Sequence, residues 1–128
     1  MPKKKGRFED KSSAELAFIC LLFAPIVETL LFQALIIGAL KWMGLGLGTQ
    51  VVASAFLFAL IHFGESIAVG VVAGIPGGLY LGFAFAFWLQ DSFWTAFWVT
   101  AVSHFLNNLF PATMLIWRKH RKKKANAD

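Results

Sequence analysis

The sequence has 128 residues, enough for one domain of modest size, and its composition is that of a membrane protein. Hydrophobic residues make up 58% of the chain, charged residues make up 15%, and the mean hydropathy is +0.65. A soluble domain of this size cannot hide so much apolar surface, and a single cysteine excludes a disulfide scaffold. A disordered chain is excluded as well, because such chains are poor in apolar residues.

Basic residues flank the apolar part of the chain. Of the 12 Lys and Arg residues, five lie in the first 13 positions and six in the last 11, which leaves Lys41 alone in the interior. A nucleic-acid-binding face would spread its cations over a folded surface, so we expect no nucleic-acid partner. The pattern instead predicts basic tails at 1–13 and 118–128 around a membrane-embedded domain at 14–117. We expect both tails to be cytoplasmic and to contact anionic lipid headgroups.

Four apolar stretches lie between the tails, and each can hold the ~20 residues with which a helix crosses a bilayer. They cover residues 16–40, 42–64, 66–90 and 92–117, and the one charge inside them is that of Glu28. An even number of crossings agrees with basic segments at both ends. The sequence therefore predicts an all-α, polytopic membrane protein built as a bundle of about four transmembrane helices.

Glycine and proline interrupt this pattern in two places. Glycines at 44, 46 and 48 predict the first turn, and the run Gly-Ile-Pro-Gly-Gly at 74–78 predicts a kinked or broken third segment. We therefore place the second helix from about 49 into the 60s and the third helix from about 76 to 89. In the alternative placement, the second helix continues to about 70 and the Gly-Pro-Gly run is a surface turn.

Polar residues within the apolar stretches are the candidates for a site, because each is costly in lipid unless it is compensated. Glu28 lies ~18 Å along the first helix, close to the bilayer midplane, and His104 lies ~20 Å from the cytoplasmic end of the fourth. The two residues thus fall at nearly equal depth. Asn108 shares a helix face with His104, and the second helix contributes His62. The sequence predicts that three helices bring these four side chains to one interior site.

Other interpretations of these residues remain open. Polar contacts between helices could account for Glu28, His104 and Asn108 without any chemistry. Glu65 is a rival carboxylate if the second helix is long, or a solvated loop residue if it is not. Cys20 has no base beside it in the sequence, which is typical of a small core residue.

The four residues together suit the hydrolysis of an amide. A carboxylate in a desolvated pocket can act as a general base near neutral pH, and with a histidine it could activate water. A second histidine and an asparagine amide could donate to the oxyanion. Alternatively, Glu28, His62 and His104 could bind Zn²⁺ with water in the open position, although no H-E-x-x-H motif is present. We expect no cofactor and no metal.

Three short motifs resemble those of the CPBP family of intramembrane endopeptidases (CAAX protease and bacteriocin-processing, or Abi). Residues 25–33 resemble the first motif, E-E-x-x-x-R, residues 58–62 fit the second, F-x-x-x-H, and residues 104–108 fit the third, H-x-x-x-N/D. Their order and approximate spacing also agree. The resemblance covers about residues 24–109 and implies a helical membrane protease similar to the type II CAAX prenyl endopeptidase.

The resemblance also implies roles for individual residues. The leading Glu of the first motif and the His of the second activate water, and by position these are Glu28 and His62. The His and Asn of the third motif, here His104 and Asn108, stabilise the oxyanion. The mechanism that the resemblance implies uses no metal, and Phe58 of the second motif is a supporting residue.

The first motif departs from the family pattern at two positions. Thr29 replaces the second Glu and Gln33 replaces the Arg. Loss of the Arg removes a buried cation, and loss of the second Glu removes a carboxylate that this cation would neutralise. The two changes therefore compensate electrostatically, which indicates a neutralised variant in which Thr29 and Gln33 are supporting residues.

The predicted function is hydrolysis of a peptide bond in a membrane-associated protein or peptide, at or just within the cytoplasmic face. Two other functions remain open. One is a catalytically inactive family member that acts as a membrane partner or immunity-like factor. The other is a small four-helix proton-coupled drug antiporter that uses Glu28, in which two intramembrane histidines would have no role.

Overall fold

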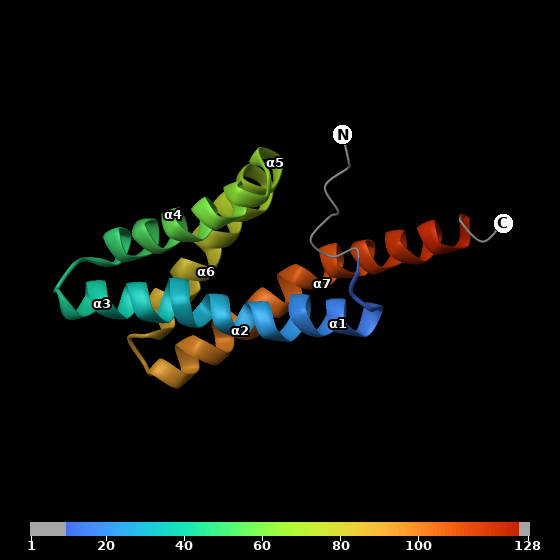
Figure 1. Ribbon diagram of the computed structural model, residues 1–128. Coiled ribbons are helices and arrows are strands. Elements are labelled where there is room, and N and C mark those ends of the chain that lie inside the picture. The colour runs from blue at the N-terminus through green and yellow to red at the C-terminus, as the bar shows by residue number, and fades with distance from the viewer. Residues whose placement is uncertain (1–9, 126–128) are drawn as a thin grey trace.

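The computed structural model describes residues 10–125, and all regular secondary structure within them is helical. Four long helical segments follow one another: Ser13–Trp42, Leu47–Glu65, Ile67–Trp88 and Phe93–Ala125. In Figure 1 the first and last segments form a long pair, and the middle two form a hairpin inclined to that pair. The predicted all-α fold class and the four-helix architecture are confirmed.

The first span (Ser13–Trp42) is a continuous helix with two wider, π-helical turns. It consists of α1 (Ser13–Phe18), η1 (Ile19–Phe23), α2 (Ala24–Glu28), η2 (Thr29–Leu35) and α3 (Ile36–Trp42). A capping box starts it: the Ser12 hydroxyl accepts from the Glu15 N–H, and the Glu15 carboxylate accepts from the Ser12 N–H. Turns of the π type are frequent at functional sites, and η2 begins directly after Glu28.

The second and third spans form the hairpin. The second is α4 (Leu47–Glu65), and the third span (Ile67–Trp88) consists of α5 (Ile67–Val69), η3 (Gly70–Gly74) and α6 (Ile75–Trp88). The chain turns at Ser66, which has an extended backbone, and the Ser66 hydroxyl accepts from the Val69 N–H.

The predicted third helix, from about 76 to 89, agrees with α6 within one residue at each end, but the helical span begins earlier, at Ile67. The alternative placement is wrong, because the second helix ends at Glu65 and the Gly-Pro-Gly run lies inside the third span. The wider turn η3 comes directly before the first turn of α6, where Pro76 lies. A π-helical turn shifts the hydrogen-bond pattern, so the helix accommodates the proline's missing N–H without ending.

Glycines bring the third span close to α4. Gly74, Gly78 and Gly82 recur every fourth residue and lie against α4. A Cβ on Gly78 would be 2.9 Å from the backbone of Ala55, and a Cβ on Gly74 would be 2.9 Å from the His62 Cβ. Small residues at such spacing allow membrane helices to approach closely. This contact fixes the place of His62 relative to the third span.

The first span and α7 (Phe93–Ala125) pack antiparallel in a single register. Ser13 Oγ lies 3.1 Å from His120 Nε2, and Glu28 Oε2 lies 3.5 Å from His104 Nε2. Further along, Ile37 belongs to the same buried cluster as Ala96 and Phe97. From each point to the next, the steps along the first span and back along α7 therefore agree to within two residues.

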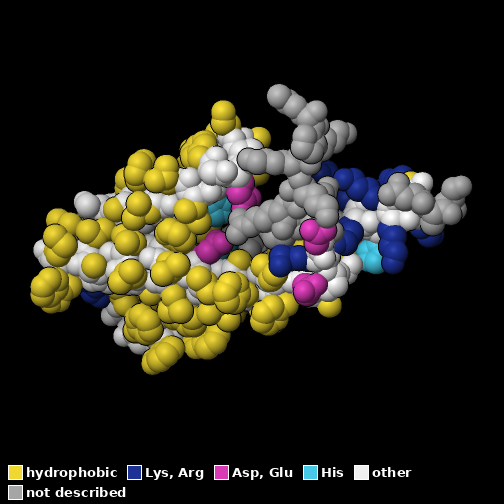
Figure 2. Space-filling model, viewed as in Figure 1, with side chains coloured by type: hydrophobic (Ala, Val, Ile, Leu, Met, Phe, Trp, Pro, Cys, Tyr) yellow, Lys and Arg dark blue, Asp and Glu magenta, His cyan; other side chains and the backbone are white. Residues whose placement is uncertain are grey.

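Within the described residues, three segments have the length and hydropathy of membrane-spanning helices, namely Ser13–Trp42, Leu47–Glu65 and Ile67–Trp88. The fourth, α7, is 33 residues long and contains Pro111. Figure 2 shows apolar side chains over most of the visible face and basic side chains gathered near the end of α7. The chain is a multi-pass membrane protein, and the cytoplasmic placement of both termini stays a prediction.

The two basic segments are described only in part. Four cations of the first segment lie outside the described residues, namely Lys3, Lys4, Lys5 and Arg7. At the other end, residues 118–125 continue α7 as a regular helix, and the Arg121 guanidinium lies 4.9 Å from the centre of the Trp117 ring.

Candidate active site

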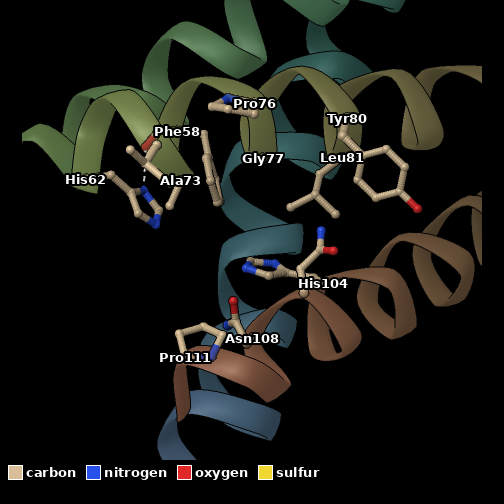
Figure 3. Close-up of a pocket in the computed structure, with 12 residues that line it drawn as sticks. Phe58, His62, Ala73, Pro76, Gly77, Tyr80, Leu81, His104, Asn108 and Pro111 are labelled. Carbon is tan, nitrogen blue, oxygen red and sulfur yellow. Dashed lines mark hydrogen bonds between the residues drawn. The ribbon is translucent and has the colours of Figure 1, made fainter. Parts of the chain in front are cut away.

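One cleft of about 440 Å³ lies between α4, the third span and α7 (Figure 3). Its lining residues are Phe58 and His62 of α4, Val72, Ala73, Pro76, Gly77, Tyr80 and Leu81 of the third span, and His104, Asn107, Asn108 and Pro111 of α7. Three of the four predicted catalytic residues therefore face the same space.

The fourth predicted residue, Glu28, contacts this group through His104. Glu28 Oε2 lies 3.5 Å from His104 Nε2, as expected from their equal depth. The His104 side chain is only 3% exposed, whereas the Glu28 side chain is 23% exposed. The separation is longer than the usual hydrogen-bond distance of roughly 2.7–3.2 Å.

Phe58 separates the two histidines of the cleft. The centre of its ring lies 4.4 Å from that of His62 and 5.6 Å from that of His104. In Figure 3 a hydrogen bond joins the His62 Nδ1 to the carbonyl oxygen of Phe58, at 2.8 Å. Because a carbonyl can only accept, the His62 Nδ1 carries a proton and donates it, which leaves Nε2 of the neutral ring as an acceptor.

Asn108 is joined to the first span. Its Nδ2 donates to the carbonyl oxygen of Cys20 at 3.0 Å, and Cys20 lies in the π-helical turn η1. This bond uses one of the two N–H groups of the amide and fixes its orientation. Asn108 therefore has a second N–H for a ligand in the cleft.

Other cleft residues were not selected from the sequence. Asn107 is exposed and lines the cleft beside Asn108, and Tyr80 and Pro111 border the same space. The available signal was a pair of consecutive asparagines in an otherwise apolar helix. Tyr80 gave no comparable signal, because one tyrosine in an apolar helix is typical of packing.

Thr29 and Gln33 do not line the cleft. Both are fully buried at 0% exposure, on the part of the first span that follows Glu28. A Glu and an Arg at these positions would place two charges in a closed interior, where each requires the other. Their joint replacement by neutral side chains agrees with the predicted electrostatic compensation.

Glu65, the rival carboxylate, does not line the cleft, and the three candidate zinc ligands do not come together. Glu65 is exposed at the end of α4 and is not among the cleft residues. Within residues 10–125, no three His, Cys, Asp or Glu side chains come together closely enough to hold a metal ion. Glu28, His62 and His104 therefore do not form a ligand set for Zn²⁺ in this structure.

Comparison with known protein families supports the resemblance seen in the three motifs. Residues 11–110 match the family described as type II CAAX prenyl endopeptidase Rce1-like. No match was found among curated proteins or among solved structures. The matched residues include all three motifs and most of the chain. The chain therefore belongs to the Rce1-like type II CAAX prenyl endopeptidase family.

Proposed function

We propose that this chain is an intramembrane endopeptidase that hydrolyses a peptide bond of a membrane-associated protein or peptide. One observation carries the proposal: Glu28 contacts His104 beside a cleft that His62 and Asn108 also line. Membership of a family of intramembrane proteases supports the same reaction class. The roles of the individual residues are our inference from their geometry.

In the proposed reaction, Glu28 and His62 activate the attacking water. The His62 Nδ1–H is held by the Phe58 carbonyl, so its Nε2 can accept a hydrogen bond from that water. Glu28 takes the proton of the water as general base, and the water oxygen attacks the carbonyl carbon of the scissile bond.

His104 and Asn108 stabilise the oxyanion that this attack forms. The Nε2–H of a neutral His104 and the second amide N–H of Asn108 are both donors. The bond from Asn108 to the Cys20 carbonyl holds the amide before substrate binds, so little reorganisation is required. The oxyanion then collapses, the C–N bond breaks, and protonated Glu28 returns its proton to the leaving amine.

The cleft suits an extended peptide. Its third-span wall includes Pro76, Tyr80 and Leu81, whereas its α7 wall offers the amide groups of Asn107 and Asn108. A transmembrane substrate must unwind before cleavage, and its freed backbone groups then need hydrogen-bond partners. We assign the binding of the substrate backbone to Asn107, because this residue lines the cleft together with His104 and Asn108.

The proposal is tested by mass spectrometry of membrane-protein N-termini and released peptides, in host cells carrying the wild type or the Glu28→Gln variant. New termini that require wild-type protein would support proteolysis, and their flanking residues would define the substrate class. Glu65→Gln is the matched control and should behave as wild type, because Glu65 lies outside the cleft. Identical profiles, with all proteins confirmed in the membrane, would contradict the proposal and favour an inactive partner.

A further inference from the structure

Five buried polar side-chain atoms of the first span and α7 have no hydrogen-bond partner within residues 10–125. They are Thr29 Oγ1, Gln33 Nε2, Gln33 Oε1, Thr100 Oγ1 and His104 Nδ1. Thr29, Gln33 and Thr100 are 0% exposed and His104 is 3% exposed. Folded proteins satisfy nearly all such atoms with protein groups or ordered water. Five such atoms on two helical segments in contact, η2 and α7, therefore indicate a place for buried water between them.

The register between the first span and α7 places these residues at neighbouring levels of two helical segments, η2 and α7, that are in contact. Thr29 follows Glu28, which contacts His104, and Gln33 lies four residues further along. Thr100 lies four residues before His104, on the same face of α7. The two helices run antiparallel, and the five-residue step from Glu28 to Gln33 differs by one residue from the four-residue step from His104 back to Thr100. We call Thr29, Gln33 and Thr100 the polar layer.

The chemistry of His104 gives this layer a use. To donate to an oxyanion, Nε2 must carry the proton, so Nδ1 of the neutral ring must accept a hydrogen bond. The polar layer contains two hydroxyl donors and one amide donor at the depth of this ring. The Glu28 carboxylate, 3.5 Å from Nε2, also favours a proton on that nitrogen, but no longer does so once Glu28 has taken the proton of the water. Without a donor at Nδ1, the proton could then reside on Nδ1, and Nε2 would repel an oxyanion.

We propose that the polar layer positions His104 by holding a buried water that donates to its Nδ1, and so maintains the Nε2–H tautomer. Gln33 and Thr100 thereby act as positioning residues, since they touch neither the cleft nor the substrate. The catalytic consequence rests on the proposed function. The tautomer itself is a property of the resting protein and can be measured without any substrate.

The direct test is ¹⁵N NMR of histidine-labelled protein in lipid nanodiscs, with the His104 signals assigned from their loss in His104→Gln. Wild type should show His104 as a single Nε2–H tautomer. The double variant Gln33→Leu with Thr100→Val keeps the bulk of the layer but removes the donors of both positioning residues, leaving the Thr29 hydroxyl, and should give a mixture of tautomers or the Nδ1–H form. An unchanged single tautomer would overturn the proposal.

Two further comparisons separate positioning from a merely structural role. Gln50→Leu removes another buried amide, which donates to the Leu45 carbonyl at 2.6 Å, and should leave the His104 signals unchanged. Thr100→Ser retains a hydroxyl and should restore the wild-type tautomer, whereas Thr100→Val alone should shift it. This pair also serves if the double variant does not fold, and equal spectra for Ser and Val would contradict the proposal.

Activity provides an independent measurement. In metal sites, loss of the hydrogen-bond partner that orients a histidine typically lowers activity by about 10- to 100-fold. We expect an effect of similar size at His104. The double variant should therefore reduce kcat by about tenfold or more while KM changes little. If wild type cleaves no substrate, the proposed function fails, and the NMR comparison still decides whether the polar layer sets the tautomer.

Discussion

The carbonyl oxygen of Phe58 accepts a hydrogen bond from the His62 Nδ1 at 2.8 Å, and the ring of the same phenylalanine packs 4.4 Å from that imidazole. One residue therefore sets both the tautomer of His62 and the position of its ring. The second motif, F-x-x-x-H, thus describes a local unit in which the two residues lie one helical turn apart.

Replacement of the Phe58 ring should affect turnover more than substrate binding. Phe58→Leu keeps the carbonyl but removes the ring between the two histidines. Because small displacements of catalytic groups cost up to about 10²-fold, we expect kcat to fall by at least about tenfold with KM near the wild-type value. Phe56→Leu is the control, because Phe56 is 65% exposed on the same helix. Equal effects of the two changes would argue against this role.

Glu28→Gln should leave the protein folded and abolish cleavage. Glutamine keeps the shape of the side chain but cannot take a proton from water, and general-base catalysis typically contributes 10²–10⁴-fold. Initial rates with a peptide found by the mass-spectrometric comparison would measure the effect. Residual activity above about 1% of wild type would exclude the general-base role.

The adjacent asparagines should differ in kinetic effect. Asn108→Ala removes an oxyanion donor, so kcat should fall by about 10²-fold or more. Asn107→Ala should mainly raise KM, because its amide is assigned to the substrate backbone in the ground state. Steady-state kinetics on both variants would reveal the difference. If Asn107→Ala lowered kcat and left KM unchanged, its assignment to substrate binding would be wrong.

Restoring the family residues in the first motif should show strong coupling. Thr29→Glu or Gln33→Arg alone buries an unpaired charge at a 0% exposed position, which should destabilise the fold by about 3–5 kcal/mol. The double variant pairs the two charges and should be destabilised by clearly less than the sum of the two single changes. Unfolding in detergent measures all three variants. Additive losses would show that the two positions do not interact.

Gly78→Ala should loosen the hairpin. Its Cβ would lie 2.9 Å from the Cα and the carbonyl oxygen of Ala55, so the two helices must move apart, at a cost of about 1–3 kcal/mol. Gly38→Ala is the matched control, since a Cβ there has nothing within 4 Å, and this change should be neutral or stabilising. Thermal unfolding of both variants in the same detergent tests the difference.

The helices could be predicted because hydrophobic length is a local property of the sequence. The start of the third span could not, since a single extended residue, Ser66, makes the preceding turn. A Gly-Pro-Gly run usually ends a helix, but here the wider turn η3 comes directly before the turn with Pro76, and the helix continues. The cost of a proline inside a helix depends on the local hydrogen-bond geometry, which the residue types alone do not determine.

For the site, the depth of each residue along its helix could be predicted, but the direction in which its side chain points could not. Glu28 and His104 meet because rise per residue is constant along a helix. Which way each side chain points depends on angular phase, and the two π-helical turns of the first span change that phase. This is why the bond from Asn108 to Cys20 and the buried position of Thr100 were not predicted.

The length of α7 has a practical consequence. Its 33 residues extend ~50 Å, whereas the hydrocarbon core of a bilayer is ~30 Å thick, so one end of the helix must project from the lipid. The charged residues 118–124 identify that end, and its position 123 lies about 19 residues, or ~28 Å, beyond His104. Lys123→Cys would therefore give an attachment point for a spectroscopic probe or a solid support, far from the reacting groups and in a chain whose single native cysteine, Cys20, is half-buried.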